Sequence, residues 1–154
     1  MAARIDELCD AIAARLMSQW ASPAPAVVLV DEEYTVPDAL PAGRVVFVND
    51  IGYTQAEQVS RDEDSYDYQV GILVVERYPG AGTPPKAWLR ERKEWVESNI
   101  FRPLNDSRVL LAGAFRAYQS PEVISIDREA AMMHHLFWSE LVLIYRECRL
   151  SNEV

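Results

Sequence analysis

The chain has 154 residues, of which 49% are hydrophobic and 25% charged, the composition of an ordinary globular protein with one domain over residues 1–154. It contains no run of about 18 apolar residues, so neither a membrane-spanning helix nor a membrane partner is expected. The formal net charge of −9 argues against sequence-specific nucleic-acid binding, which normally uses a basic surface. An acidic protein is still suited to line a passage through which DNA slides without sticking.

The N-terminal half predicts one helix and two strands. Apolar residues recur at every third or fourth position over residues 4–20, as on one face of an amphipathic helix. They are Ile5, Leu8, Ile12 and Leu16. Acids interrupt this pattern, so the segment is not a signal peptide, and we expect the chain to stay in the cytoplasm. Ala26–Val30 and residues 44–49 are short runs rich in β-branched side chains, which predict strands.

Residues 65–78 form the most distinctive stretch of the chain. In its first half, aromatic or apolar side chains alternate with small or polar ones, as in a strand with one buried face. The buried face would hold Tyr66, Tyr68, Val70, Ile72 and Val74. Residues 72–75 are apolar on both faces, so this end of the strand should lie inside a sheet.

The segment before this strand, residues 50–64, is predicted to be a long polar loop between two antiparallel strands. Residues 49–67 contain six acids and one arginine, and so carry five of the nine net negative charges. The simplest interpretation is a solvated loop, but long loops in compact domains are often functional. We therefore predict a channel or partner surface formed by these acids and one aromatic anchor. Its residues are Asp50, Tyr53, Glu57, Asp62, Glu63, Asp64 and Asp67.

The C-terminal half predicts a second helix followed by shorter elements. Residues 86–101 have an apolar face and a charged face, and Pro103 should end this helix. Residues 109–118 predict a strand that is interrupted near Gly113, and residues 128–132 predict a short helical turn.

The last predicted strand, residues 137–146, is apolar on both faces at 141–144 and polar near its start. It shares this pattern with residues 65–78, so the two strands should be neighbours. Runs of strands with helices set apart indicate an α+β fold. We predict a mainly antiparallel sheet of about four to five strands, with two principal helices packed on one face.

No catalytic, metal or cofactor site is predicted. His134 and His135 are adjacent, and neighbouring residues on a strand point to opposite faces, so the two would not chelate one ion easily. No nucleophile motif accompanies them. Paired acids in a flexible polar loop are poorly placed for general acid or base catalysis. We expect a binding or structural role and not an enzyme.

The order of these patterns resembles that of the small, lambda-type tail terminator proteins (minor tail or neck proteins) of tailed bacteriophages and prophages. The resemblance spans residues 4–149 and consists of patterns of hydrophobicity and order, not of an invariant motif. It rests on the helix IDELCDAIAARL, the strand RVVFVN, the polar stretch leading into YDYQVGILVVER, the helix KAWLRERKEWVESNI and the strand FWSELVLIYR.

The resemblance implies an α+β subunit that assembles into a ring, commonly a hexamer, on the last ring of a tail tube. Such a subunit stops tube polymerisation and offers the surface for head-tail joining, with DNA passing through the ring. Its partners would be copies of itself, the tail tube protein and head connector proteins. It would reside in the virion tail, and in the host cytoplasm during assembly. Acids on a channel wall would repel the phosphate groups of DNA.

Other interpretations differ in class. A head-completion or connector protein of the neck would share the size, the acidity and the ring formation. A host-encoded oligomeric binding module without catalysis is the second alternative, and a small enzyme is the third. A stable monomer at micromolar concentration would weaken both phage interpretations.

Overall fold

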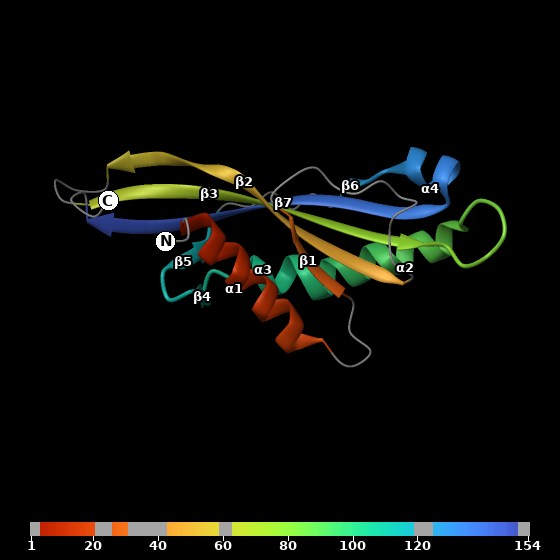
Figure 1. Cartoon of the computed structure of the whole chain (residues 1–154), viewed down its shortest axis with the longest axis horizontal. Helices are drawn as coiled ribbons and strands as arrows, with labels where there is room; N and C mark the ends of the chain where they lie inside the picture. The colour runs from red at the N-terminus through yellow and green to blue at the C-terminus, as the bar shows by residue number, and fades with distance from the viewer. Residues whose placement is uncertain (1–3, 21–25, 31–42, 59–62, 119–124, 151–154) are drawn as a thin grey trace.

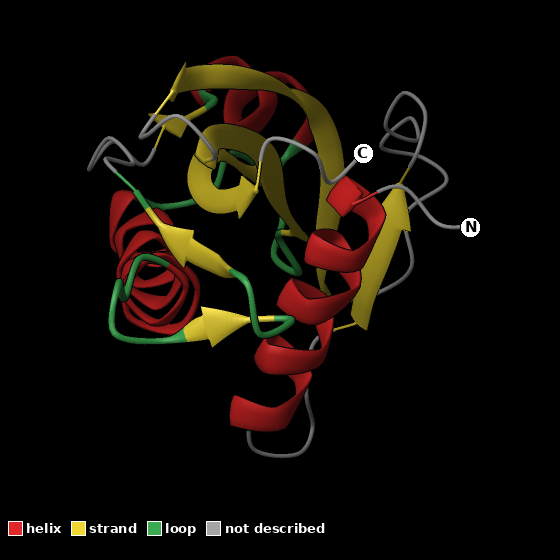
Figure 2. Ribbon diagram, turned by 90° about the vertical axis from the view of Figure 1, so that its left-hand side faces the viewer, coloured by secondary structure: helices red, strands yellow, loops and turns green. Residues whose placement is uncertain are grey.

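The computed structural model of the protein describes residues 4–20, 26–30, 43–58, 63–118 and 125–150. One long sheet runs the length of the molecule, and helices α1 (Arg4–Gln19) and α2 (Lys86–Val96) lie on the same side of it (Figure 1). In the end-on view, the long strands curl above these two helices (Figure 2). The fold is therefore α+β with two principal helices on one face of the sheet, as predicted.

Within the described residues, the sheet has seven strands in the order β1-β2-β3-β7-β5-β4, with β6 paired to β7. Every pairing is antiparallel except that of β1 with β2. Three strands are only two or three residues long, which is why the sequence predicted fewer of them. The strands are β1 (Ala26–Val30), β2 (Arg44–Gln58), β3 (Glu63–Arg77), β4 (Leu110–Leu111), β5 (Phe115–Ala117), β6 (Ser125–Ile126) and β7 (Leu136–Leu150).

The two strands that are apolar on both faces are neighbours, as predicted. β3 and β7 pair over their whole length, and Ile72 lies opposite Leu141. The main core fills the side of the sheet that faces α1 and α2, and a smaller cluster around Phe47 and Leu73 fills the opposite side. Because both sides are covered in this region, neither face needs polar side chains there.

The predicted polar loop over residues 50–64 is wrong. β2 continues to Gln58 and β3 begins at Glu63, so most of this segment belongs to one long hairpin, and residues 59–62 lie outside the described part of the chain. The β2–β3 register shifts between Asp50 and Gly52 and again between Gln55 and Glu57. Each bulge adds a residue to one strand and so breaks the alternation by which a strand is recognised in a sequence.

The second helical segment begins at Lys86, as predicted, but continues to Leu104 and not only to residue 101. Its α-helical part stops at Val96, and Glu97–Phe101 continues as a π-helix. A final short helix, α3 (Arg102–Leu104), contains Pro103 in its first turn. Phe101 and Arg102 keep helical backbone angles, and the Arg102 N–H donates to the Glu97 carbonyl, so the chain passes from the π-helix into α3 without a break. Pro103 therefore starts the last turn and does not end the helix.

The histidine pair does not lie on a strand, contrary to prediction. The predicted helical turn is the helix α4 (Arg128–His134), and His135 caps it in the left-handed region with φ 55°. The predicted interruption near Gly113 is confirmed, since Ala112 and Gly113 both have positive φ and separate β4 from β5.

Two arginines and two tryptophans clamp α2 to the sheet around Glu76 of β3. Arg44 and Arg92 bind the two oxygens of the Glu76 carboxylate, with nitrogen–oxygen distances of 3.1 and 2.6 Å. Each guanidinium group also stacks on an indole ring, Arg44 on Trp95 and Arg92 on Trp88, at 4.2 Å from each ring centre. We call these five residues the Glu76 clamp. Burial lowers the pKa of Arg44, an effect that the nearby Glu76 carboxylate opposes.

Tyr145 joins β7 to the end of the second helical segment. Its ring is 1% exposed, and its hydroxyl donates a hydrogen bond to the carbonyl oxygen of Leu104 over 2.5 Å. Burial raises the pKa of this phenol above its ordinary value. The neutral phenol therefore contributes its full stabilisation at pH values below about 10, the pKa of a tyrosine in the unfolded chain. This contribution is lost as the pH rises through the higher pKa that Tyr145 has in the folded chain.

Replacing Tyr145 by phenylalanine is expected to lower the free energy of unfolding at pH 7 by about 1–2 kcal/mol, because the Leu104 carbonyl loses its donor. The variant should also show a smaller loss of stability above pH ~10 than the wild type, since it has no phenol to ionise at this site. Urea denaturation at several pH values measures both effects. Tyr53→Phe is the control, since that side chain is 59% exposed. An equal loss in both variants would contradict the assignment.

Candidate partner-binding surface

The predicted surface residues lie along the β2–β3 hairpin and not on a separate loop. Asp50, Tyr53 and Glu57 belong to β2, and Glu63, Asp64 and Asp67 belong to β3. Asp62 lies outside the described residues, and only the backbone positions of Glu57, Glu63 and Asp64 are described. These strands continue past α2 to one end of the molecule (Figure 1). We call residues 50–58, 63–69 and 144–150 the distal ribbon.

β7 brings basic residues to the acids of the distal ribbon. The register places Arg146 opposite Asp67 and Arg149 opposite Asp64. The Arg146 guanidinium group donates hydrogen bonds to both oxygens of the Asp67 carboxylate, at 2.8 and 3.2 Å. This bond to Asp67 raises the pKa of Arg146. The negative charge counted over residues 49–67 is therefore partly offset by Arg146 of β7, a strand that is distant in the sequence.

Tyr118 completes the environment of Arg146. The Arg146 guanidinium group lies 3.4 Å from the centre of the Tyr118 ring, and the Tyr118 amide donates to the Ile144 carbonyl at 2.8 Å. Asp67, predicted as part of an open acidic surface, is instead one member of an ordered ion pair under an aromatic ring. Its side chain is 21% exposed, so it remains within reach of a partner only at its edge.

Tyr53 is the most exposed of the three predicted residues whose side chains are described, the others being Asp50 and Asp67. Its ring is 59% exposed, yet it stacks on the buried ring of Tyr68 with their centres 5.4 Å apart. Tyr68 in turn meets the buried Phe115 edge to face at 5.1 Å. A ring held in place from below loses little freedom when a partner covers it, which is the property of an interface anchor.

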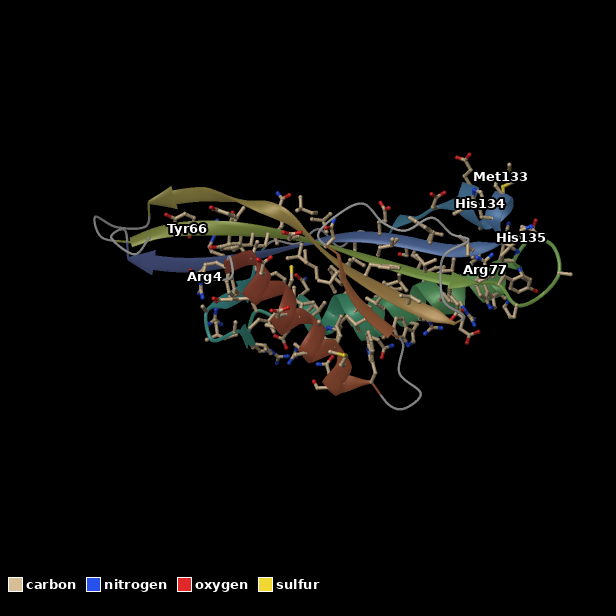
Figure 3. The ribbon with its side chains drawn as sticks, viewed as in Figure 1. Arg4, Tyr66, Arg77, Met133, His134 and His135 are labelled. Atoms are coloured by element: carbon tan, nitrogen blue, oxygen red, sulfur yellow. The ribbon has the colours of Figure 1, made fainter. Side chains whose placement is uncertain are left out.

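Sequence reasoning missed a groove at the other end of the molecule. It lies between α2 and the β6–α4 segment and has a volume of about 730 Å³. Lys86, Arg90 and Lys93 of α2 line it together with Arg128 of α4, and its other lining residues include no acid. We call this site the basic groove. Met133 and His134 of α4 mark this end of the molecule, opposite the end marked by Tyr66 (Figure 3).

The basic groove was hidden in the sequence for two reasons. The charges of α2 alternate in sign, which is typical of a solvated helix face. Arg128 belongs to a different helix, and only the folded chain brings it to α2. Met132 also lines the groove and is exposed, but from the sequence an apolar residue in a short helix is expected to be buried.

Within residues 4–150, apart from the undescribed segments, no three His, Cys, Asp or Glu side chains gather as metal ligands. In the same part of the chain, no helix combines the length and the apolar character needed to cross a membrane.

A comparison with known proteins finds no matching family model and no significantly similar curated protein.

Proposed function

We propose that the protein is a structural subunit of a phage tail that forms a ring, caps the tail tube, ends its polymerisation and offers the surface for head-tail joining. The proposal comes from the resemblance to tail terminators together with the α+β architecture that this resemblance implies. The single observation that carries it is the length of the sheet. β2, β3 and β7 have 15 residues each and so span about 50 Å.

A long subunit with two different ends suits a ring. Ring contacts are heterologous, so each subunit must offer two different surfaces to its neighbours. One end here is the distal ribbon with the exposed Tyr53, and the other carries α4 and the basic groove. In this proposal the distal ribbon is the channel or partner surface that the sequence predicted on an acidic loop, and Tyr53 is its anchor. A neck connector protein remains the alternative, with the head instead of the tube as its partner.

The test is negative-stain imaging of the protein alone and after mixing with tail tube protein. We expect annular particles at the ends of the tubes, and shorter tubes when the protein is present during polymerisation. Tyr53→Ser should weaken capping by about tenfold or more, as for the loss of an interface anchor. Met17→Ser is the matched control, because Met17 is 54% exposed on α1, away from the distal ribbon.

Two results would contradict the proposal. One is a protein that stays monomeric and leaves tube length unchanged. The other is binding to head connector proteins without any binding to tubes, which would favour the neck alternative.

A further inference from the structure

Four of the residues that line the basic groove are cations, and none of its lining residues is an acid. In the described part of the chain, none of Lys86, Arg90, Lys93 and Arg128 makes an ion pair. By contrast Arg92, on the same helix, binds Glu76. Such a concentration of positive charge is unexpected in a protein with a net charge of −9.

Three of the four cations lie on α2, and the acids of that helix, Glu91 and Glu94, do not line the groove. Lys86, Arg90 and Lys93 are four and three residues apart, so they share one helix face, where like charges repel. Lys86 is also the first residue of α2, and the first turn holds no acid. The start of a helix favours negative charge because its amide groups point outwards there. Both effects would be relieved by an anionic ligand.

Apart from Thr83, the other residues that line the groove are apolar, and this restricts the kind of anion. Its lining includes Leu89, Ile126 and Met132, and the Met132 side chain is 65% exposed. Met133 beside it is 69% exposed. Exposed methionines are typical of surfaces that accept apolar side chains of peptides. A nucleic-acid backbone has phosphates but no apolar side chains that could pack against these apolar residues.

We propose that the basic groove binds an acidic peptide segment of a partner protein, with carboxylates that meet the four cations and apolar side chains that cover Leu89, Ile126 and Met132. The volume of about 730 Å³ accommodates a few side chains, not a whole domain. Charge and surface chemistry argue for this partner together, since neither a purely ionic nor a purely apolar ligand would satisfy both parts of the groove. The inference rests on the groove alone and does not depend on ring formation.

The experiment uses a short fluorescein-labelled peptide of alternating glutamate and leucine residues and the full chain, followed by fluorescence anisotropy. We expect saturable binding that weakens by about tenfold or more between low and physiological salt, because the cations are exposed. The double variant Arg90→Gln, Lys93→Gln should weaken binding by about tenfold or more. Arg102→Gln should bind as the wild type does, because Arg102 lies outside the groove and is 69% exposed.

A second set of binding measurements tests the contact between the apolar lining of the groove and the apolar side chains of the peptide. Met132→Ser should weaken binding of the glutamate–leucine peptide but not of a glutamate–serine peptide, which should already bind more weakly. All substituted residues are exposed, so thermal unfolding should be nearly unchanged and a loss of binding would not reflect misfolding. The inference would be overturned by absent binding, by unchanged binding in the double variant, or by a single-stranded DNA of equal charge that binds as tightly as the peptide.

Discussion

Replacing Glu76 by glutamine is expected to lower the free energy of unfolding by about 2–3 kcal/mol. Among the described residues, the Glu76 carboxylate is the ion-pair partner of Arg44, and it also binds Arg92. The side chains of the two arginines are 19% and 17% exposed. Removing its charge leaves two guanidinium groups close together in a poorly solvated place, and breaking such a pair is far more damaging than losing a surface ion pair. Urea denaturation followed by tryptophan fluorescence measures the change, because Trp88 and Trp95 belong to the same cluster.

Glu91→Gln is the matched control for this variant. Glu91 also contacts Arg92, at 3.4 Å, but its side chain is 78% exposed. An ion pair in water contributes little, so the expected change is below about 0.5 kcal/mol. If both glutamine variants lost the same stability, the Glu76 clamp would have no special role in holding α2 to the sheet.

Replacing Phe115 by alanine is expected to lower the free energy of unfolding by about 4 kcal/mol. The ring is fully buried, lies edge to face with Tyr68 at 5.1 Å, and has the guanidinium group of Arg4 over it at 5.0 Å. Its removal leaves a cavity where β5, β3 and α1 meet, and cavities of this kind lower stability by about 3–5 kcal/mol. Because Tyr68 supports Tyr53, the exposed anchor of the distal ribbon should also become more mobile.

Two further variants keep this prediction testable even if the alanine variant does not fold. Phe115→Leu retains most of the volume, so a loss of about 1–1.5 kcal/mol is expected. Leu110→Ala, in the neighbouring strand β4, should lose less than about 1 kcal/mol, because that side chain is 47% exposed. Denaturation measurements should show the largest loss of unfolding free energy for Phe115→Ala, a smaller loss for Phe115→Leu and the smallest for Leu110→Ala. Equal losses would contradict the prediction.

The parts of the fold that follow from local patterns were predictable from the sequence. The spacing of Ile5, Leu8, Ile12 and Leu16 is that of a helix with one buried side, and all four are buried in α1. The matching apolar runs of β3 and β7 identified those strands as neighbours, because only interior strands can be apolar on both faces. Helix content and strand content together then indicated the α+β class.

What was not predictable depends on bulges and on contacts between distant segments. The second half of β2 is polar and contains two bulges, so no regular alternation marks it as a strand. The charge of Asp67 was counted without Arg146, which reaches it only because β7 pairs with β3. The basic groove needs α2 and α4 side by side. In each case the local pattern carries no information about the segment that it meets in the folded chain.

The position of β7 also has a consequence for how the chain folds. β2 and β3 are consecutive strands of a hairpin, whereas β7 follows β3 only after all of the helical segment from Lys86 to Leu104 and three short strands. Pairing between distant segments is slow because a large loop must close first. During synthesis, the hairpin therefore presents one unpaired edge of β3, 15 residues long, until the final strand emerges. Such an edge is open to aggregation until β7 docks, so this docking step removes the exposed edge as well as completing the sheet.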